Sequence, residues 1–204
     1  MKKTVKITEK QLHNIVKSVI CEAMKEMDLY HGTKADFDQF DLAYMSTGWG
    51  KQAHGYGFYL IDDYEAAKSY SLGGQIMTVQ VPDKGYLSDK KISMTEKKRI
   101  ANKLYRLFTV DDPDRRLSYQ TEQEKRDCWE YEIKCILDCY DGNYVYGTVN
   151  ALLGDDKETT QFLHNLGYVG LKVPDEVTHS TIYVIFDPND MKIIKKDKVN
   201  NDEL

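Results

Sequence analysis

The sequence predicts a single α+β domain, because expected strands lie toward both ends of the chain and expected helices lie between them. A length of 204 residues suits one domain with a sizeable buried core. Hydrophobic residues make up 41% and charged residues 30%, which is ordinary for a globular protein. Neither internal repeats nor linker-like segments divide the sequence, so one domain is favoured over two.

The net charge and the apolar runs lead us to expect a cytoplasmic protein that is not attached to a membrane. A formal net charge of -5 argues against a protein built to coat nucleic acid or an anionic membrane. No apolar run approaches the roughly 18 residues needed to cross a bilayer. The apolar segment of a signal peptide is also missing after Lys2 and Lys3.

The four cysteines predict no metal site. Cys128, Cys135 and Cys139 are spaced seven and four residues apart, which is one face of a helix and not a zinc knuckle. Together with Cys21 they are interpreted as small buried hydrophobic residues in a reducing compartment.

The first expected element is an N-terminal amphipathic helix within residues 1–27. Thr8 and Gln11 can form its capping box. Apolar residues then recur at helical spacing: Leu12, Ile15, Val16, Val19, Ile20, Ala23, Met24 and Met27. We interpret this stripe as packing on the rest of the domain; the alternative is a helix that pairs with a partner.

Three strands and one short helix are expected in the first half of the chain. Leu29-Tyr30 and Phe58–Ile61 form the first two strands, and Tyr64–Tyr70 forms the helix. Gln75–Val81 alternates between apolar and polar residues as a third strand, which Pro82 ends.

Helices fill the middle of the chain, and strands return at its end. Two helices should begin with capping boxes, formed by Ser93 with Glu96 and by Thr121 with Glu124. A break at 111–114 separates them, and shorter helices follow at 145–153 and 159–166, the last ending at Gly167. The final strands are expected at 168–173, 181–186 and 191–194, with a turn at 187–190 and a charged tail at 196–204.

Chemistry-bearing residues gather between Leu29 and Tyr70. This stretch holds two of the five histidines, five of the thirteen glycines and six of the fifteen tyrosines. Glycine lets a ligand approach the backbone, tyrosine offers a flat apolar face, and histidine provides hydrogen bonds. The stretch therefore predicts a cleft for a planar ligand with a polar rim. The letters of residues 48–53 match a dinucleotide fingerprint, but the required strand before it and helix after it are missing.

The motifs of this stretch resemble those of the diphtheria-toxin-like ADP-ribosyltransferases, the class that includes the poly(ADP-ribose) polymerases. Tyr30-His31-Gly32-Thr33 is similar to their first motif, and Gly55–Asp62 followed by Ala66–Tyr70 to their second. The likeness is closer to the transferase domains of phage and mobile-element polyvalent proteins. It rests there on three further segments, which are Phe37–Asp41, Thr47–Gln52 and Tyr183–Pro188.

The resemblance implies a fold and a domain organisation. The fold would be ADP-ribosyltransferase-like, with split antiparallel β-sheets, a helical insertion and the N-terminal helix. The transferase-like domain would occupy residues 28–195, between the helix at 1–27 and the tail at 196–204.

The resemblance also implies a role for each matching residue, with NAD as the substrate. His31 would hydrogen-bond the ribose hydroxyls, and the backbone of Gly32, followed by Thr33, would hold the nicotinamide carboxamide. Tyr59 would stack on one face of the nicotinamide and Tyr70 would cover the other. His31 and Tyr59 are accordingly the first catalytic candidates.

Two positions depart from the family pattern. Ala67 stands where the family has a serine that contacts the carboxamide. Ile182 stands where chain-elongating members have a glutamate, and it is counted here among the NAD-binding positions. Members with an apolar residue at that place are generally mono-ADP-ribosyltransferases or inactive. Glu176, in the loop before that strand, is the candidate substitute for the missing carboxylate.

The sequence thus leads to a mono-ADP-ribosyltransferase of phage or mobile-element type, toxin-like, that cleaves NAD at the nicotinamide–ribose bond. The acceptor would be an unidentified protein or, less expected, a nucleic acid. The alternatives are an NAD glycohydrolase and a catalytically weak NAD-binding module. An RNA 2′-phosphotransferase shares the fold but needs basic residues around the cleft.

Overall fold

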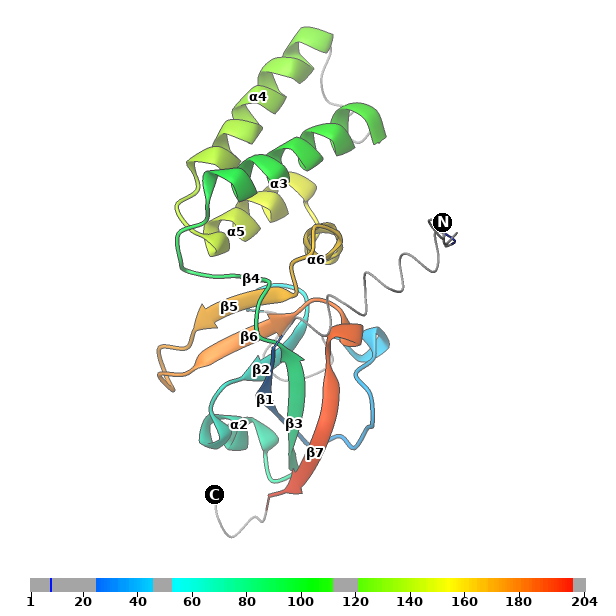
Figure 1. Cartoon of the computed structure of the whole chain (residues 1–204), viewed down its shortest axis with the longest axis vertical. Coiled ribbons are helices and arrows are strands. Elements are labelled where there is room, and N and C mark those ends of the chain that lie inside the picture. The colour runs from blue at the N-terminus through cyan, green and yellow to red at the C-terminus, as the bar shows by residue number, and fades with distance from the viewer. Residues whose placement is uncertain (1–7, 9–24, 46–52, 112–120, 200–204) are drawn as a thin grey trace, which may run out of the picture.

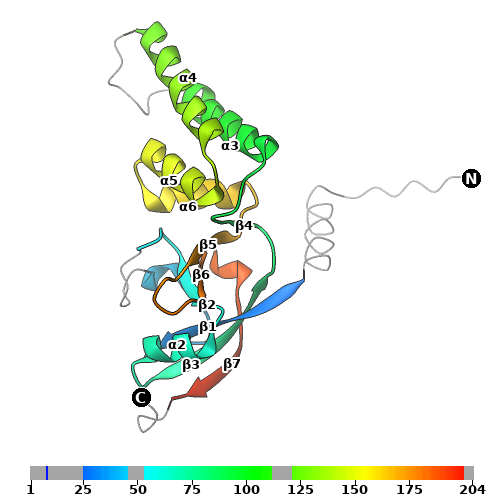
Figure 2. The same ribbon diagram turned by 90° about the vertical axis from the view of Figure 1, so that its left-hand side faces the viewer.

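The computed structural model describes residues 8, 25–45, 53–111 and 121–199. Its described part is a mixed α+β fold with one seven-stranded, mostly antiparallel sheet and five α-helices. In both views the helices α3 to α6 lie at one end of the molecule, while α2 lies against the other part of the sheet (Figure 1 and Figure 2). Most of the predicted N-terminal helix, the loop at 47–52 and the Pro113 break lie outside the described residues.

The sheet has the strand order β4-β5-β6-β2-β1-β3-β7. All neighbouring strands are antiparallel except β4 and β5, which are parallel. The strands are β1 Glu26–Thr33, β2 Phe58–Ile61, β3 Gln75–Pro82, β4 Tyr86–Leu87, β5 Gly170–Pro174, β6 Thr181–Ile185 and β7 Lys192–Lys198. The strands predicted from alternation and motifs are therefore confirmed in kind and approximate position.

The prediction of two separate sheets is wrong, because all seven strands form one sheet. The strand pairing between β1 and β2, where the two sheets were expected to separate, is short. β1 pairs with β3 from Glu26 to Thr33, and β2 pairs with β6 from Phe58 to Ile61. Between these halves, β1 and β2 pair in register at Tyr30 opposite Ile61. This pairing joins the two halves into one sheet. It is short, because β2 has just four residues and only its end meets β1.

Two strands are longer than predicted. β1 begins at Glu26, so residues 26 and 27 belong to a strand and not to the predicted N-terminal helix. β7 continues to Lys198 because it pairs with β3 from Gln75 to Gln80, so the strand predicted at 191–194 extends into the predicted charged tail. The lysine-rich sequence of β7 is typical of an edge strand. Because it lacks a regular alternation of apolar and polar residues, the full length of this strand could not be predicted from the sequence.

The helices follow the predicted capping signals. They are α2 Tyr64–Ser71, α3 Met94–Arg106, α4 Glu122–Asp138, α5 Gly142–Leu153 and α6 Asp156–Asn165. Both predicted capping boxes are present at the starts of α3 and α4. Three-residue 3-10 helices lie at Leu42–Tyr44 and Pro188–Asp190, and a π-helix follows α3 at Leu107–Asp111. Gly154 and Gly167, just beyond α5 and α6, adopt positive φ values of 73° and 88°.

Apolar side chains fill both faces of the sheet. The largest core lies between the sheet and α3 to α6 and includes Ile100, Leu163 and Val184. A second core covers the opposite face around Leu29 and Leu60. A third, smaller cluster holds α2 against the sheet. None of the described helices is long and apolar enough to cross a membrane.

Lys97 ties α3 to the end of α4. Its ammonium donates to the carbonyl oxygens of Leu137 at 2.5 Å and Cys139 at 2.7 Å, where helix carbonyls lack helical partners. Lys97→Met keeps the aliphatic stem but leaves these buried acceptors unpaired, so we expect the free energy of unfolding to fall by about 1–3 kcal/mol. Urea denaturation measures this, with Lys98→Met, at an exposed neighbouring position, as the control. Equal stability of the two variants would contradict the role given to Lys97.

Candidate active site

His31 lies near the end of β1 and links this strand to β2. Its Nδ1 atom is 2.9 Å from the carbonyl oxygen of Tyr59. A carbonyl oxygen can only accept, so Nδ1 carries the hydrogen and Nε2 of the neutral ring is an acceptor. Burial lowers the pKa of His31, against a smaller raising effect of this hydrogen bond, and therefore favours the neutral ring. Among the described residues no hydrogen-bond partner of Nε2 is found.

Two phenylalanines hold the ring of His31 in place. The ring centroid of His31 is 6.2 Å from that of Phe37 and 5.3 Å from that of Phe40, the latter in an edge-on arrangement. Both phenylalanines come from the loop that follows β1, within the segment Phe37–Asp41 that carries part of the family resemblance. They also pack against the core that contains Leu60, so the loop and the histidine form one packed unit.

Gly32 allows α2 to pack directly on the backbone of β1. A Cβ atom at this position would overlap the carbonyl oxygen of Ala67 and lie 2.7 Å from the backbone nitrogen of Ser71. Since both neighbours are main-chain atoms of α2, no side-chain movement can relieve this contact. Glycine is therefore required where β1 meets the helix that carries Tyr70.

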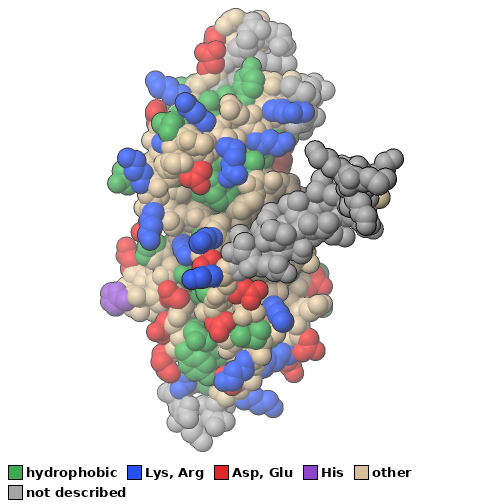
Figure 3. All heavy atoms as spheres, in the orientation of Figure 1, with side chains coloured by type: hydrophobic (Ala, Val, Ile, Leu, Met, Phe, Trp, Pro, Cys, Tyr) green, Lys and Arg blue, Asp and Glu red, His purple; other side chains and the backbone are tan. Residues whose placement is uncertain are grey.

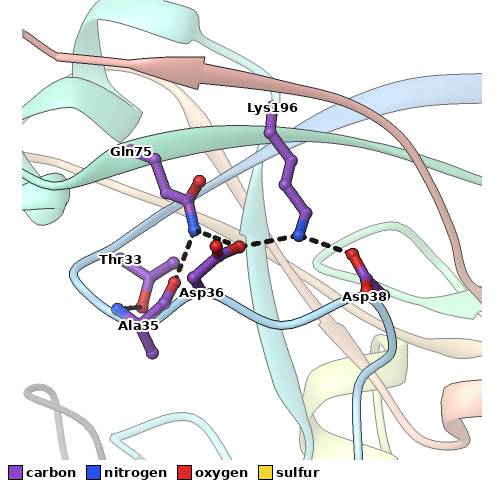
Figure 4. A network of polar contacts seen from close by, with 6 residues as sticks. All are labelled: Thr33, Ala35, Asp36, Asp38, Gln75 and Lys196. Carbon is purple, nitrogen blue, oxygen red and sulfur yellow. Dashed lines mark hydrogen bonds and ion pairs between the residues drawn. The ribbon is translucent and has the colours of Figure 1, made fainter.

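A polar network fixes the loop after Thr33 (Figure 4). The Thr33 hydroxyl accepts a hydrogen bond from the backbone nitrogen of Ala35 at 3.1 Å. Gln75 on β3 donates to the carbonyl oxygen of Ala35 at 2.6 Å. Lys196 on β7 bonds both Asp36 and Asp38 at 2.8 Å, and its contact with Asp36 lowers the pKa of that carboxyl. The network ties the backbone beyond the His31-Gly32-Thr33 motif to two neighbouring strands.

Tyr59 is held by the turn that precedes β2. Its hydroxyl donates to the carbonyl oxygen of Gly55 at 2.9 Å and accepts from the backbone nitrogen of His54 at 2.9 Å. Burial is the main cause that raises the pKa of Tyr59 to about 12, so the phenol is neutral at pH 7. The ring packs against the core between the sheet and the helices.

The glycines of this turn allow its close packing. Gly55 has a φ of 115°, and a Cβ atom there would lie 2.7 Å from the Tyr146 ring. A Cβ atom on Gly57 would lie 2.6 Å from a methyl group of Val184. The motif glycines thus let the turn lie between α5 and β6, and this position in turn holds the Tyr59 hydroxyl.

Tyr70 lies in the last turn of α2 and is half exposed, at 50%. Burial of the phenol, followed by the negative charge of Asp175, raises the pKa of Tyr70. Asp175 follows β5, and its carboxylate accepts from Thr178 Oγ1 at 2.6 Å and from the Val177 nitrogen at 3.0 Å. The Thr178 bond is the main cause that lowers the pKa of Asp175, and the charge of His54 also contributes. The Asp175 carboxylate thus interacts electrostatically with Tyr70.

The two remaining predicted positions differ in environment. Ile182 lies on β6, opposite Ile61 of β2 and Val173 of β5, and packs against the apolar clusters beneath α2 and beneath α5. It is an apolar part of the sheet between these helices. Glu176 is exposed in the loop between β5 and β6, directly after Asp175.

A cavity of about 410 Å³ opens beside the turn that holds Tyr59. Its walls come from three parts of the chain: the turn (Ala53, His54, Gly55), the helices α5 and α6 (Asn143, Tyr146, Asn150, Asp156) and strand β5 (Leu171, Val173). The Asn143 side chain donates to the Lys172 carbonyl oxygen at 3.4 Å, while its own Oδ1 is buried without a hydrogen-bond partner in the described structure. A ligand in this cavity would find polar groups on the helix side and apolar ones on the sheet side.

The predicted residues are only partly brought together. His31 contacts the backbone of Tyr59, and Tyr59 and Ile182 pack against the same core. None of His31, Gly32, Tyr59, Tyr70 and Ile182 lines the 410 Å³ cavity, but two of its lining residues, His54 and Gly55, hydrogen-bond the Tyr59 hydroxyl. Sequence reasoning missed Asp175 and the helix wall, although Asn143, Tyr146 and Asn150 share one helix face by their spacing. Within the described residues, no cluster of His, Cys, Asp or Glu suited to a metal ion is found.

Comparison with known proteins gives one family. The family model described as "ADP-Ribosyltransferase in polyvalent proteins" matches residues 25–201. No curated protein matches the sequence. A solved structure titled "Crystal structure of an anti-CRISPR protein" matches at 15% identity and a TM-score of 0.34, covering 85% of this chain and 96% of that one. At that TM-score the likeness supports no conclusion about the fold or the function of this chain.

Proposed function

The chain belongs to the ADP-ribosyltransferase family of polyvalent proteins, and from this premise we propose that it is a mono-ADP-ribosyltransferase. It cleaves NAD at the nicotinamide–ribose bond and passes ADP-ribose to a macromolecular acceptor, a protein in preference to a nucleic acid. On the face in Figure 3, acidic and basic side chains are interspersed over the sheet half, so the described residues there present no continuous basic surface, which suits an acceptor other than RNA.

The observation that carries the proposal is the hydrogen bond between His31 Nδ1 and the Tyr59 carbonyl oxygen. It joins the two motif strands and fixes the tautomer in which Nε2 can accept from a hydroxyl group. A ribose hydroxyl of NAD is the donor that this acceptor would bind. The low pKa of His31 supports the role, because a protonated ring would lose the acceptor.

Tyr59 and Tyr70 supply the aromatic walls of the proposed site. Tyr59 is fixed through its hydroxyl, whereas the half-exposed Tyr70 ring remains accessible to a ligand. Cleavage of the glycosidic bond passes through an oxocarbenium-like transition state. The protein therefore accelerates it mainly by holding the nicotinamide and the ribose in fixed orientations.

Asp175 is the carboxylate that we assign to the proposed site in preference to Glu176. Its charge contributes to raising the pKa of Tyr70, and the hydrogen bond from the Thr178 hydroxyl lowers the pKa of Asp175 itself and so keeps it ionised. Such a carboxylate stabilises positive charge that develops on the ribose. The exposed side chain of Glu176 makes no comparable contact among the described residues.

Asp175→Asn is expected to reduce nicotinamide release at least tenfold, because it removes the negative charge and keeps a side chain that can still accept in the turn. Glu176→Gln is the matched control and should stay within about twofold of the wild-type rate. Initial rates of nicotinamide release from NAD measure both. A larger loss in Glu176→Gln than in Asp175→Asn would reverse the assignment.

A second candidate, a catalytically weak NAD-binding module, is favoured by Ile182, because no carboxylate stands at that position of β6. Incubation with NAD labelled in its adenylate part, together with host lysate, separates the possibilities. Label on a macromolecule together with free nicotinamide supports the transferase. Nicotinamide without labelled acceptor supports hydrolysis, and saturable NAD binding without nicotinamide supports the module.

A further inference from the structure

A second cavity, of about 460 Å³, lies on the opposite face of the sheet from the first. Lys172 and Pro174 of β5 line it, whereas the alternate residues Leu171 and Val173 line the first cavity. The other walls are residues 83–86 and 88–90 around β4, with Thr181 and Tyr183 of β6. Nothing in the proposed transferase chemistry uses this cavity.

Two tyrosine rings hold the ammonium group of Lys172 at this cavity. Its Nζ atom is 4.8 Å from the ring centroid of Tyr86 and 4.9 Å from that of Tyr183. The two rings meet edge to face, with centroids 5.3 Å apart. The Tyr86 hydroxyl also donates to the Pro82 carbonyl oxygen at 2.7 Å, which fixes that ring. The ammonium is therefore positioned by the fold and not by a flexible surface contact.

Lys172 has no ion-pair partner in the described part of the chain. Burial is the main cause that lowers its pKa, and the positive charge of Lys90 lowers it further, while the charges of Asp83 and Asp62 act more weakly in the opposite direction. A partly desolvated cation beside a second cation is unfavourable unless an anion joins them.

The charges around the cavity limit the kind of anion. Lys84, Lys90 and Lys172 line it, but so do the carboxylates of Asp83 and Asp89. These two acidic groups would repel an extended polyanion. A single compact anionic group would meet less of this repulsion than an extended polyanion.

We propose that this cavity binds the phosphate or carboxylate group of a small ligand, with Lys172 as the anchor and Lys90 as the second cation. Tyr86 and Tyr183 hold the anchor from behind. The site is independent of the proposed NAD chemistry, because none of the residues assigned to that chemistry lines it.

The test is an NMR titration of the full chain, labelled with ¹⁵N, with inorganic phosphate and with acetate at constant ionic strength. We expect saturable shifts at the amides of Lys90, Lys172 and Tyr86 with at least one anion. Shifts with phosphate alone identify a phosphate site, and shifts with acetate alone identify a carboxylate site.

Lys172→Met should weaken this binding at least tenfold, because methionine retains an aliphatic stem between the rings and lacks the charge. Lys172→Arg should bind within about threefold of the wild type, and Lys98→Met on α3 should bind as the wild type does. Unchanged binding in Lys172→Met would overturn the proposal, as would the absence of saturable shifts with both anions. The NAD turnover of the same variants shows separately whether the proposed function stands.

Discussion

His31→Ala is expected to lower NAD turnover at least tenfold. The substitution removes both the Nε2 acceptor proposed for the ribose and the Nδ1 bond to Tyr59 that joins the two motif strands. The loss of one positioned hydrogen bond, together with the orientation that it gives the substrate, commonly lowers the rate of an enzyme tenfold or more. Initial rates of nicotinamide release, with kcat and KM determined separately, measure the effect.

Two matched variants separate the roles of the His31 ring. His31→Asn can still donate to the Tyr59 carbonyl oxygen but loses the acceptor at the place of Nε2, so it should be nearly as slow as His31→Ala while remaining better folded. His164→Ala on α6, which loses a contact of 2.9 Å to Asp190, should retain the wild-type rate. Wild-type turnover in both His31 variants would contradict the proposed role.

The rate should depend on pH in the direction that the His31 pKa sets. Burial holds this pKa below its ordinary value of 6.5, so the ring is neutral at pH 7. The rate should therefore not fall between pH 8 and 7 through this group, and should fall only below the ordinary range, as the ring gains a proton. The same shift makes the folded state less stable below pH 6.5, because the unfolded chain binds that proton more readily.

Gly32→Ala is expected to be the most destabilising small substitution in the motif region. The added Cβ would overlap main-chain atoms of α2 at Ala67 and Ser71, so the helix must move away from β1. Overpacking of this kind costs about 1–3 kcal/mol, and sometimes more. Urea denaturation measures this loss of stability. We also expect the displaced helix α2 to carry Tyr70 away from its position.

Gly147→Ala on α5 is the control for this substitution. A Cβ atom there meets no heavy atom within 4 Å, and alanine is favoured over glycine inside a helix by about 0.5–1 kcal/mol. The two glycine-to-alanine changes should therefore shift stability in opposite directions. Equal effects would show that the contact between β1 and α2 does not constrain Gly32.

Local patterns were enough to predict the elements on which the site is built. Capping boxes at Ser93 and Thr121 marked helix starts, because a cap depends on residues within one turn. The strand from Gln75 was predictable because apolar and polar residues alternate along its sequence, although the fold buries most of both kinds. The motif around His31 and Gly32 was recognisable because these residue types sit next to each other in sequence.

Features that depend on distant contacts were not predictable in this way. β4 has two residues, too few for any periodicity, and its strand pairing with β5 crosses more than eighty residues of chain. The joint between β1 and β2 depends on how far each strand runs beside the other, which alternation does not encode. Asp175 was overlooked beside Glu176, because the two carboxylates are distinguished by Thr178 and Tyr70 and not by sequence position.

The role of Asp62, the aspartate of the second motif, also depends on a distant contact that the sequence does not reveal. Asp62 ends the second motif in the sequence, and in the fold its carboxylate accepts from the Thr181 nitrogen at 2.7 Å. The Asp62 nitrogen in turn donates to the Thr181 carbonyl oxygen at 3.2 Å. Asp62 therefore joins β2 to the start of β6, the strand that carries Ile182, and its role in the motif is structural.

The central claim, that the joined motif strands form the NAD site, is tested most directly by an NMR titration of the ¹⁵N-labelled chain with NAD. We predict saturable shifts at the amides of Gly32, Tyr59, Tyr70 and Asp175, and their loss in His31→Ala. Shifts confined to Lys172, Lys90 and Tyr86 would mean that NAD binds only at the second cavity through its phosphates. That result, or the absence of saturable shifts, would contradict the account.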